Sequence, residues 1–74
     1  MRLCDIACGK TAKIVSVSLV GEYKNRLTDL GFVPDAPVTC IMKSPLGDPT
    51  AYLVRGALIA LRYEHSSKIL VEVI

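Results

Sequence analysis

The sequence predicts a mostly β fold, a small β-barrel of about five strands with one inserted α-helix and a short N-terminal helical turn. Three observations lead to this prediction. The chain has 74 residues, which suffice for one hydrophobic core but not for two. Hydrophobic residues make up 51% of it and charged residues 22%, a composition typical of folded domains. Short runs rich in β-branched residues recur between glycines and prolines. We therefore treat residues 1–74 as a single domain.

Five segments have the composition of strands: residues 11–19, 37–43, 50–55, 57–62 and 68–74. Between the second and third, the segment SPLGDP (44–49) places two prolines around a glycine and predicts the turn of an antiparallel hairpin. A short polar stretch, YEHSS, precedes the last strand. Five short strands at this spacing suit a small barrel of the SH3-like type, in which the sheet curls on itself and removes its edges.

One segment has helical periodicity. Tyr23, Leu27 and Leu30 recur at i, i+4 and i+7, and Gly31 follows as a natural C-terminal stop. The spacing predicts a helix that places these apolar residues toward the core. On its opposite face we expect Lys24, Arg26 and Asp29 to be solvated.

The N-terminus carries two cysteines at helical spacing. A helical turn would put Cys4 and Cys8 on one face, where their thiols could bind a soft metal such as zinc. A complete site needs more ligands, and only Cys40 and His65 are further strong candidates. Packing as small apolar residues is the simpler interpretation, so we expect no metal and no cofactor. An alternative is that Cys4 and Cys8 of two subunits share one metal across a dimer interface.

No catalytic constellation is recognisable. A cysteine nucleophile needs a base, and the only histidine, His65, lies beside Glu64 and two serines, where a solvated or capping side chain is typical. The seven carboxylates are dispersed, and no glycine-rich loop followed by Lys and Ser/Thr is present to bind a nucleotide. We expect a protein that is not an enzyme.

Charge and hydropathy restrict the partners and the location. The net charge is +2 and the basic residues are scattered singly, whereas nucleic-acid binders show clustered basic residues, so we expect no nucleic-acid partner. The longest apolar run, residues 57–61, is far shorter than the roughly 20 residues of a membrane span. Asp5 and Lys10 interrupt what a secretory signal would need, and an odd number of cysteines suits a reducing compartment. The prediction is a cytoplasmic protein with free thiols and no membrane insertion of its own.

The high apolar content predicts an exposed patch for a protein partner. Leu46 lies at the tip of the rigid, proline-flanked 44–49 turn, which makes this loop the best candidate contact surface. The alternative is that Leu46 folds back onto the barrel.

Nearly the whole chain resembles the FeoA family, small cytosolic proteins that accompany the bacterial ferrous iron transporter FeoB. The most specific match is PLGDP within residues 44–49. The other matching pieces are Gly9 with Ala12 and Ile14, RLTDLGF followed by Pro34, ALR at residues 60–62, and Ile69 with Val71. The chain departs from the family at Asp35, where glycine is common, and at Ser66 or Ser67, where an alanine is common. Because aspartate tolerates positive φ less well than glycine, Asp35 leaves the conformation of the turn after the helix undecided.

The resemblance implies an SH3-like barrel with an accessory role in iron uptake, exerted by contact with the cytosolic part of FeoB. We expect the contact to involve Arg26 and Leu27 of the helix and Leu46, Gly47 and Asp48 of the loop. The same small barrel resembles the C-terminal domain of DtxR-type iron-dependent repressors, so a free-standing regulatory module is an alternative. A single-strand-binding barrel is another, although the chain has few aromatic residues. Self-association and recruitment to the membrane by the partner both stay open.

Overall fold

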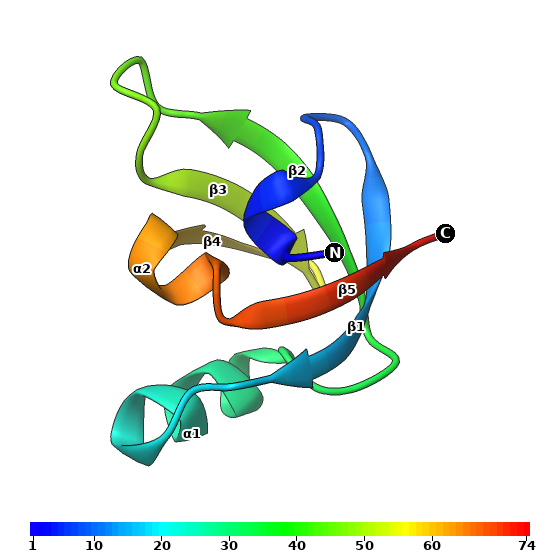
Figure 1. The fold of residues 1–74 in the computed structure, drawn as a ribbon, viewed down its shortest axis with the longest axis vertical. Coiled ribbons are helices and arrows are strands. Elements are labelled where there is room, and N and C mark those ends of the chain that lie inside the picture. Colours follow the sequence, from blue (N-terminus) through cyan, green and yellow to red (C-terminus); the bar gives the residue numbers. More distant parts are fainter.

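Five antiparallel strands form one continuous sheet (Figure 1). The computed structural model describes residues 1–74. The strands are β1 (Thr11–Val17), β2 (Pro37–Lys43), β3 (Thr50–Val54), β4 (Ala57–Leu61) and β5 (Ile69–Val73), in the spatial order β4-β3-β2-β1-β5. The predicted strands are confirmed, with ends that differ by no more than two residues. Their β-branched and aromatic residues suit a sheet with one face buried.

The sheet is not closed into a barrel, and this part of the sequence prediction is wrong. β4 and β5 are its two edges, with no ladder between them. The gap is occupied by the 3-10 turn η1 (Leu3–Asp5) and the short helix α2 (Tyr63–Ser66), which is placed between β4 and β5 in the sequence (Figure 1). A bridge between Arg2 and Leu70 ties the N-terminal segment to β5. In this protein η1 and α2 therefore cover the sheet edges that would pair with each other in a closed barrel.

The predicted helix is confirmed as α1 (Gly21–Leu30). It ends where Gly31 adopts the left-handed conformation, with φ of 114°. The Gly31 N–H donates to the Thr28 carbonyl at 3.0 Å and the Phe32 N–H donates to the Leu27 carbonyl at 2.9 Å, which satisfies two of the last four carbonyls of the helix. Neither α1 nor α2 has the length and apolar character that crossing a membrane requires.

In the turn after α1, the left-handed backbone conformation is adopted by Asp35 instead of a glycine. Asp35 has φ of 72°, its N–H donates to the Ile14 carbonyl at 2.7 Å, and the Ala36 carbonyl accepts from the Ile14 N–H at 2.9 Å. These two bonds hold the turn against β1, so aspartate takes the conformation that favours glycine.

Residues 63–66 are helical, whereas the sequence indicated only a polar stretch. Within α2, His65 stacks on Tyr23 of α1 with ring centroids 3.8 Å apart and an interplanar angle of 27°. The Nδ1 atom of His65 is buried and has no hydrogen-bond partner. The expectation of a solvated or capping histidine is therefore corrected: His65 is half-buried, because its ring packs on Tyr23.

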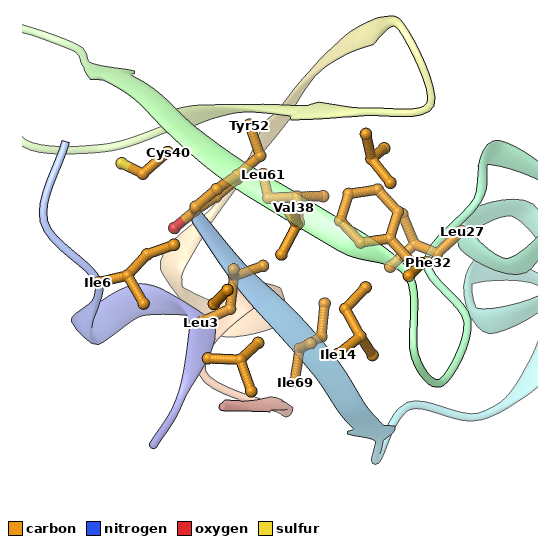
Figure 2. Packing of buried hydrophobic residues seen from close by; sticks show 14 residues of the cluster. Leu3, Ile6, Ile14, Leu27, Phe32, Val38, Cys40, Tyr52, Leu61 and Ile69 are labelled. Atoms are coloured by element: carbon orange, nitrogen blue, oxygen red, sulfur yellow. The ribbon is translucent and has the colours of Figure 1, made fainter. Parts of the chain in front are cut away.

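One hydrophobic core fills the concave side of the sheet (Figure 2). Its largest fully buried side chains include Tyr52 of β3 and Phe32, which follows α1. The complete cluster consists of Leu3, Ile6, Ala12, Ile14, Leu27, Phe32, Ala36, Val38, Cys40, Tyr52, Val54, Leu61, Ile69 and Val71. The core contains residues from η1, α1 and all five strands. Burial of apolar area therefore stabilises the packing of every element except α2 against the same core.

Candidate partner-binding site

The predicted hairpin turn between β2 and β3 is confirmed and is internally braced. The Ser44 N–H donates to the Pro49 carbonyl at 3.1 Å, and the Gly47 N–H donates to the Ser44 carbonyl at 2.8 Å. The Ser44 hydroxyl also bonds the Asp48 carbonyl at 2.7 Å, and the peptide bond between Asp48 and Pro49 is cis. Because these hydrogen bonds close the loop on itself at Ser44, the loop presents a defined surface.

Asp48 fastens the loop to α2. Its Oδ1 accepts the Tyr63 backbone N–H at 2.8 Å, and its Oδ2 lies 3.9 Å from Nη1 of Arg62. The carboxylate thereby satisfies one of the free N–H groups at the start of α2. Asp48 therefore positions the loop, while its exposed ion pair with Arg62 contributes little to stability.

Leu46 is the most exposed large apolar residue of the chain, with 94% of its side chain accessible. The alternative in which it folds back onto the sheet is therefore excluded by this structure. Exposing a leucine forgoes the roughly 1.5–3 kcal/mol that its burial would contribute, and exposed apolar residues of this kind are common at contact surfaces.

An apolar sheet face adjoins this loop. Met42 of β2 pairs with Ala51 of β3, and Ala51 pairs with Ala60 of β4. In the next row Leu53 pairs with Leu58. Paired residues of antiparallel strands point to the same side, and here that side faces away from the core because Tyr52 and Val54, which alternate with these positions, are buried. We call Met42, Ala51, Leu53, Leu58 and Ala60 the outer apolar face.

Sequence reasoning did not single out this outer apolar face or the partners of Asp48. A signal for the face was present, since residues 50–55 and 57–62 are apolar at both alternating positions, a pattern typical of strands covered on both sides. The contacts of Asp48 with Tyr63 and Arg62 join residues about fifteen apart, and no local pattern indicates them.

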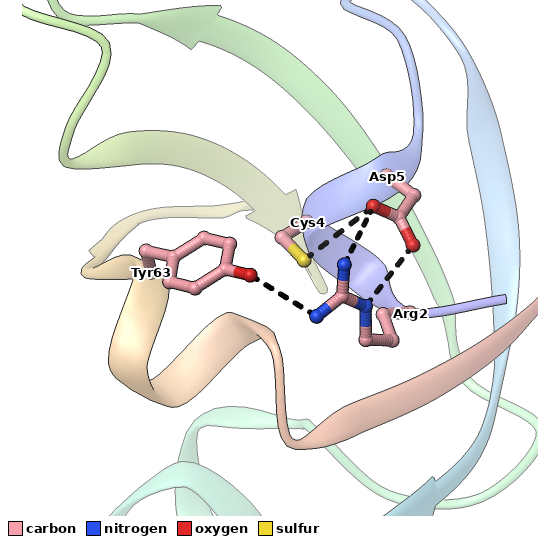
Figure 3. A network of polar contacts seen from close by, with 4 residues as sticks. All are labelled: Arg2, Cys4, Asp5 and Tyr63. Carbon is pink, nitrogen blue, oxygen red and sulfur yellow. Dashed lines mark hydrogen bonds and ion pairs between the residues drawn. The ribbon is translucent and has the colours of Figure 1, made fainter.

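Beneath the loop lies a polar network between η1 and α2 (Figure 3). The Arg2 guanidinium donates to the Tyr63 hydroxyl at 3.1 Å and pairs with the Asp5 carboxylate at 3.2 Å. The hydrogen bond from Arg2, together with the Arg2 charge, holds the pKa of Asp5 below its usual value, and the pKa of Cys4 is raised by its partial burial and by Asp5. A pocket of about 170 Å³ separates this network from the loop. That volume is below the roughly 300 Å³ of small-molecule sites, so this pocket is too small for such a ligand.

The two parts of the predicted contact lie apart. The 44–49 loop and α1 are at opposite ends of the longest dimension of the molecule (Figure 1). Arg26 is exposed on α1, where it lines a hollow of about 230 Å³ with Glu22 and Tyr23. Leu27 belongs to the core, as its spacing predicts, and its relative accessibility of 2% leaves it no surface for the direct partner contact that we also expected of it. The structure therefore gathers Leu46, Gly47 and Asp48 in one place but not with the residues of α1.

The predicted pairing of Cys4 with Cys8 is wrong within one chain. The N-terminal turn η1 ends at Asp5, so no helix carries both thiols on one face. Cys4 donates weakly to Asp5 at 3.8 Å, whereas Cys8 contacts Cys40. The structure gathers no group of three His, Cys, Asp or Glu side chains that could hold a metal ion.

Comparisons with known proteins agree on one family. The family model of the FeoA domain matches residues 1–73. A fusion of Fe(2+) transport protein A with the Fe(2+) transporter FeoB, from Porphyromonas gingivalis, is 36% identical over all 74 residues, although the chain spans only 9% of that relative. The solution structure of the FeoA protein from Chlorobium tepidum matches with a TM-score of 0.95 at 31% identity, covering 100% of this chain and 70% of that one.

A further match is a crystal structure of FeoA from Stenotrophomonas maltophilia in complex with zinc. It has a TM-score of 0.85 at 28% identity, covers 97% of this chain and 89% of that chain, and is described as a prokaryotic SH3 domain protein. The fold and the exposed loop thus define a small SH3-like β domain. The chain belongs to the FeoA family, whose members are accessory proteins of ferrous iron transport rather than a known family of enzymes.

Proposed function

We propose that this protein is a cytoplasmic accessory of ferrous iron uptake that acts by direct contact with the cytosolic part of an FeoB-type transporter. The observation that carries the proposal is the exposed Leu46, held out by a loop that hydrogen bonds brace at Ser44, Gly47 and Pro49. The Porphyromonas relative supports the choice of partner, because it joins the two proteins in one chain.

The contact surface consists of Leu46, Gly47 and Asp48 of the loop together with the outer apolar face. Leu46 would enter an apolar pocket of the partner, and Asp48 would keep the loop in place through Tyr63. The outer apolar face extends from the base of the loop, since Met42 lies two residues before Ser44. Buried apolar residues surrounded by polar ones are the usual source of affinity at such interfaces.

Arg26 would form a second, separate contact from α1. It is exposed, and Leu27 beside it would act indirectly by anchoring α1 in the core. A partner that touches both Arg26 and Leu46 would have to extend along the whole molecule, since α1 and the 44–49 loop that carry them lie at its opposite ends (Figure 1).

The first prediction is that Leu46→Asp weakens binding to the purified cytosolic domain of the cognate transporter. A charge placed in an apolar pocket should lower the affinity by at least about tenfold, since truncation of a central anchor costs about 2 kcal/mol or more. Binding is measured by calorimetry with the domain free of nucleotide, bound to GDP and bound to a GTP analogue. A difference among the three states would indicate that the contact regulates nucleotide binding.

Val20→Asp is the matched control. Val20 is also an exposed apolar residue, with 87% of it accessible, but it precedes α1 at the other end of the molecule. Aspartate there is a favourable N-cap residue, so the variant stays folded. Equal affinity of wild type and a folded Leu46→Asp variant would remove the loop from the interface.

A further inference from the structure

Two cysteine thiols lie in contact in the structure, and the proposed function does not use them. Cys40 donates its S–H to Sγ of Cys8, with 3.5 Å between the two sulfur atoms. Cys40 lies on β2, and Cys8 lies in the segment that joins η1 to β1. Backbone bonds fix this contact, because the Cys40 carbonyl accepts the Gly9 N–H at 2.7 Å and the Cys40 N–H donates to the Lys10 carbonyl at 3.0 Å.

The two thiols differ in accessibility. Cys8 is exposed, whereas Cys40 is completely buried in the core. Burial, with the neighbouring Cys8 as the next cause, raises the pKa of Cys40 to about 11. An incoming disulfide can therefore reach Cys8 first, while Cys40 reacts only with the sulfur already beside it.

We propose that Cys8 and Cys40 form a site of thiol–disulfide exchange, with a small disulfide such as oxidised glutathione as the oxidant. The Cys8 thiolate attacks one sulfur of glutathione disulfide, the S–S bond breaks, and one glutathione thiolate leaves. The Cys40 thiolate then attacks Sγ of Cys8 and expels the second glutathione. The protons from the two cysteines end on the two glutathione thiols, so the pair loses two electrons and the glutathione disulfide gains them.

The bond would fasten the N-terminal segment to β2. That segment carries η1, which lies in the gap between β4 and β5, and its backbone also reaches β5 through the Val71 N–H to the Met1 carbonyl at 2.7 Å. Oxidation would close a loop of about thirty residues and restrict the unfolded chain. We expect the thermal midpoint to rise by at least about 5 °C.

The experiment uses the whole chain, fully reduced and then incubated with oxidised glutathione. Samples are alkylated at intervals and analysed by intact mass and peptide mapping. The expected product has lost two hydrogens, joins Cys8 to Cys40, and leaves only Cys4 free for alkylation. Because Cys40 must lose its proton before the second step, that step should accelerate by about tenfold per pH unit between pH 7 and pH 9.

Variants separate the two steps. Cys40→Ala and Cys40→Ser should stop at the mixed disulfide of Cys8 with glutathione. Cys8→Ser, a change at an exposed position that leaves the core intact, should slow disulfide formation at Cys40 by at least about tenfold. Cys4→Ser is the matched control and should react like wild type.

Four results would overturn the proposal. Wild type could stop at the mixed disulfide, which would show that Cys40 does not reach Cys8. The disulfide could involve Cys4, or it could join two chains. Cys8→Ser could form a Cys4–Cys40 disulfide as fast as wild type forms its own. The Cys8→Ser and Cys4→Ser results stay informative even if both Cys40 variants fail to fold.

Discussion

Two weak acids face each other in the core. Cys40 of β2 pairs with Tyr52 of β3, and both side chains are buried. Burial raises the pKa of Tyr52 to about 12, and it is also the main reason why the pKa of Cys40 rises to about 11. Both groups therefore stay neutral in the folded protein at a pH where the unfolded chain has begun to lose these protons.

We predict a loss of stability at alkaline pH. In the unfolded chain a cysteine ionises with a pKa near 8.5–9 and a tyrosine near 10. The folded protein binds more protons above this range, so the free energy of unfolding falls as pH rises. The stabilisation is complete below about pH 8.5 and is lost as pH passes 11 and 12, at a cost of about 2–3 kcal/mol for each group. Urea unfolding in the presence of a reductant at a series of pH values measures it.

Tyr52→Phe is the control for this prediction. It removes the ionisable hydroxyl and keeps the buried ring, so the decline in the free energy of unfolding above pH 10 should be smaller than in wild type by about 2 kcal/mol. A variant with the same alkaline profile as wild type would show that Tyr52 does not cause the decline.

Single residues were predictable from sequence where local spacing decides their environment. The i, i+4, i+7 repeat placed Leu27 in the core, and its exposure of 2% confirms this. The exposed position of Leu46 was one of two outcomes that the sequence left open, because the turn is too short to cover its own leucine but the side chain could still have folded back onto the barrel. The contacts of Cys8 with Cys40 and of Asp48 with Tyr63 were not predictable, because each depends on how distant segments pack.

At the scale of elements, segments with a clear period were predicted and the short ones were not. The strands and α1 have enough residues to show alternation or a helical repeat. Helix α2 has only four residues and no repeat of apolar positions, so no periodicity reveals it. Tertiary contacts hold it in place, namely the hydrogen bond from the Tyr63 N–H to the Asp48 carboxylate at its start and the stack of His65 on Tyr23.

Two glycines at the ends of elements allow a test of how much stability is lost when a residue with a Cβ must adopt a positive φ. Gly31 ends α1 with φ of 114°, and Gly56 lies in the hairpin turn between β3 and β4 with φ of 78°. We predict that Gly56→Ala costs about 1 kcal/mol, since no atom would contact its new Cβ. Gly31→Ala should cost more, because its Cβ would lie 2.8 Å from Cδ of Arg55. Urea unfolding of the two variants measures the difference.

The Arg55→Ala variant separates the two causes of the destabilisation by Gly31→Ala, namely the steric clash with Arg55 and the positive φ. In that background Gly31→Ala should cost about as much as Gly56→Ala does in the wild-type chain, because the clashing atoms are gone. If the cost of Gly31→Ala is the same with and without Arg55, its side chain moves aside freely and only the positive φ matters.

At the scale of the whole molecule, the predicted closed barrel and the observed open sheet differ in how the gap between β4 and β5 is filled. Sequence composition indicated how many strands there are, but closure depends on the tilt and stagger of strands, which no local pattern encodes. The bulges between Ile14 and Ser16 and between Cys40 and Met42 are part of that geometry. The gap contains a buried leucine of η1 and the exposed polar network of Arg2, Asp5 and Tyr63.

The last prediction is that the leucine, and not the polar network, keeps this gap closed. Leu3 is fully buried, so Leu3→Ala should cost about 2–4 kcal/mol through lost burial and the cavity left behind. Leu58→Ala is the matched control, since 60% of Leu58 is exposed on β4, and it should cost less than about 1 kcal/mol. Arg2→Ala removes the bonds to Asp5 and Tyr63, yet these groups are exposed and their pairing is screened by water. Its urea midpoint should therefore match that of wild type, and a loss as large as that of Leu3→Ala would assign the closure to the polar network instead.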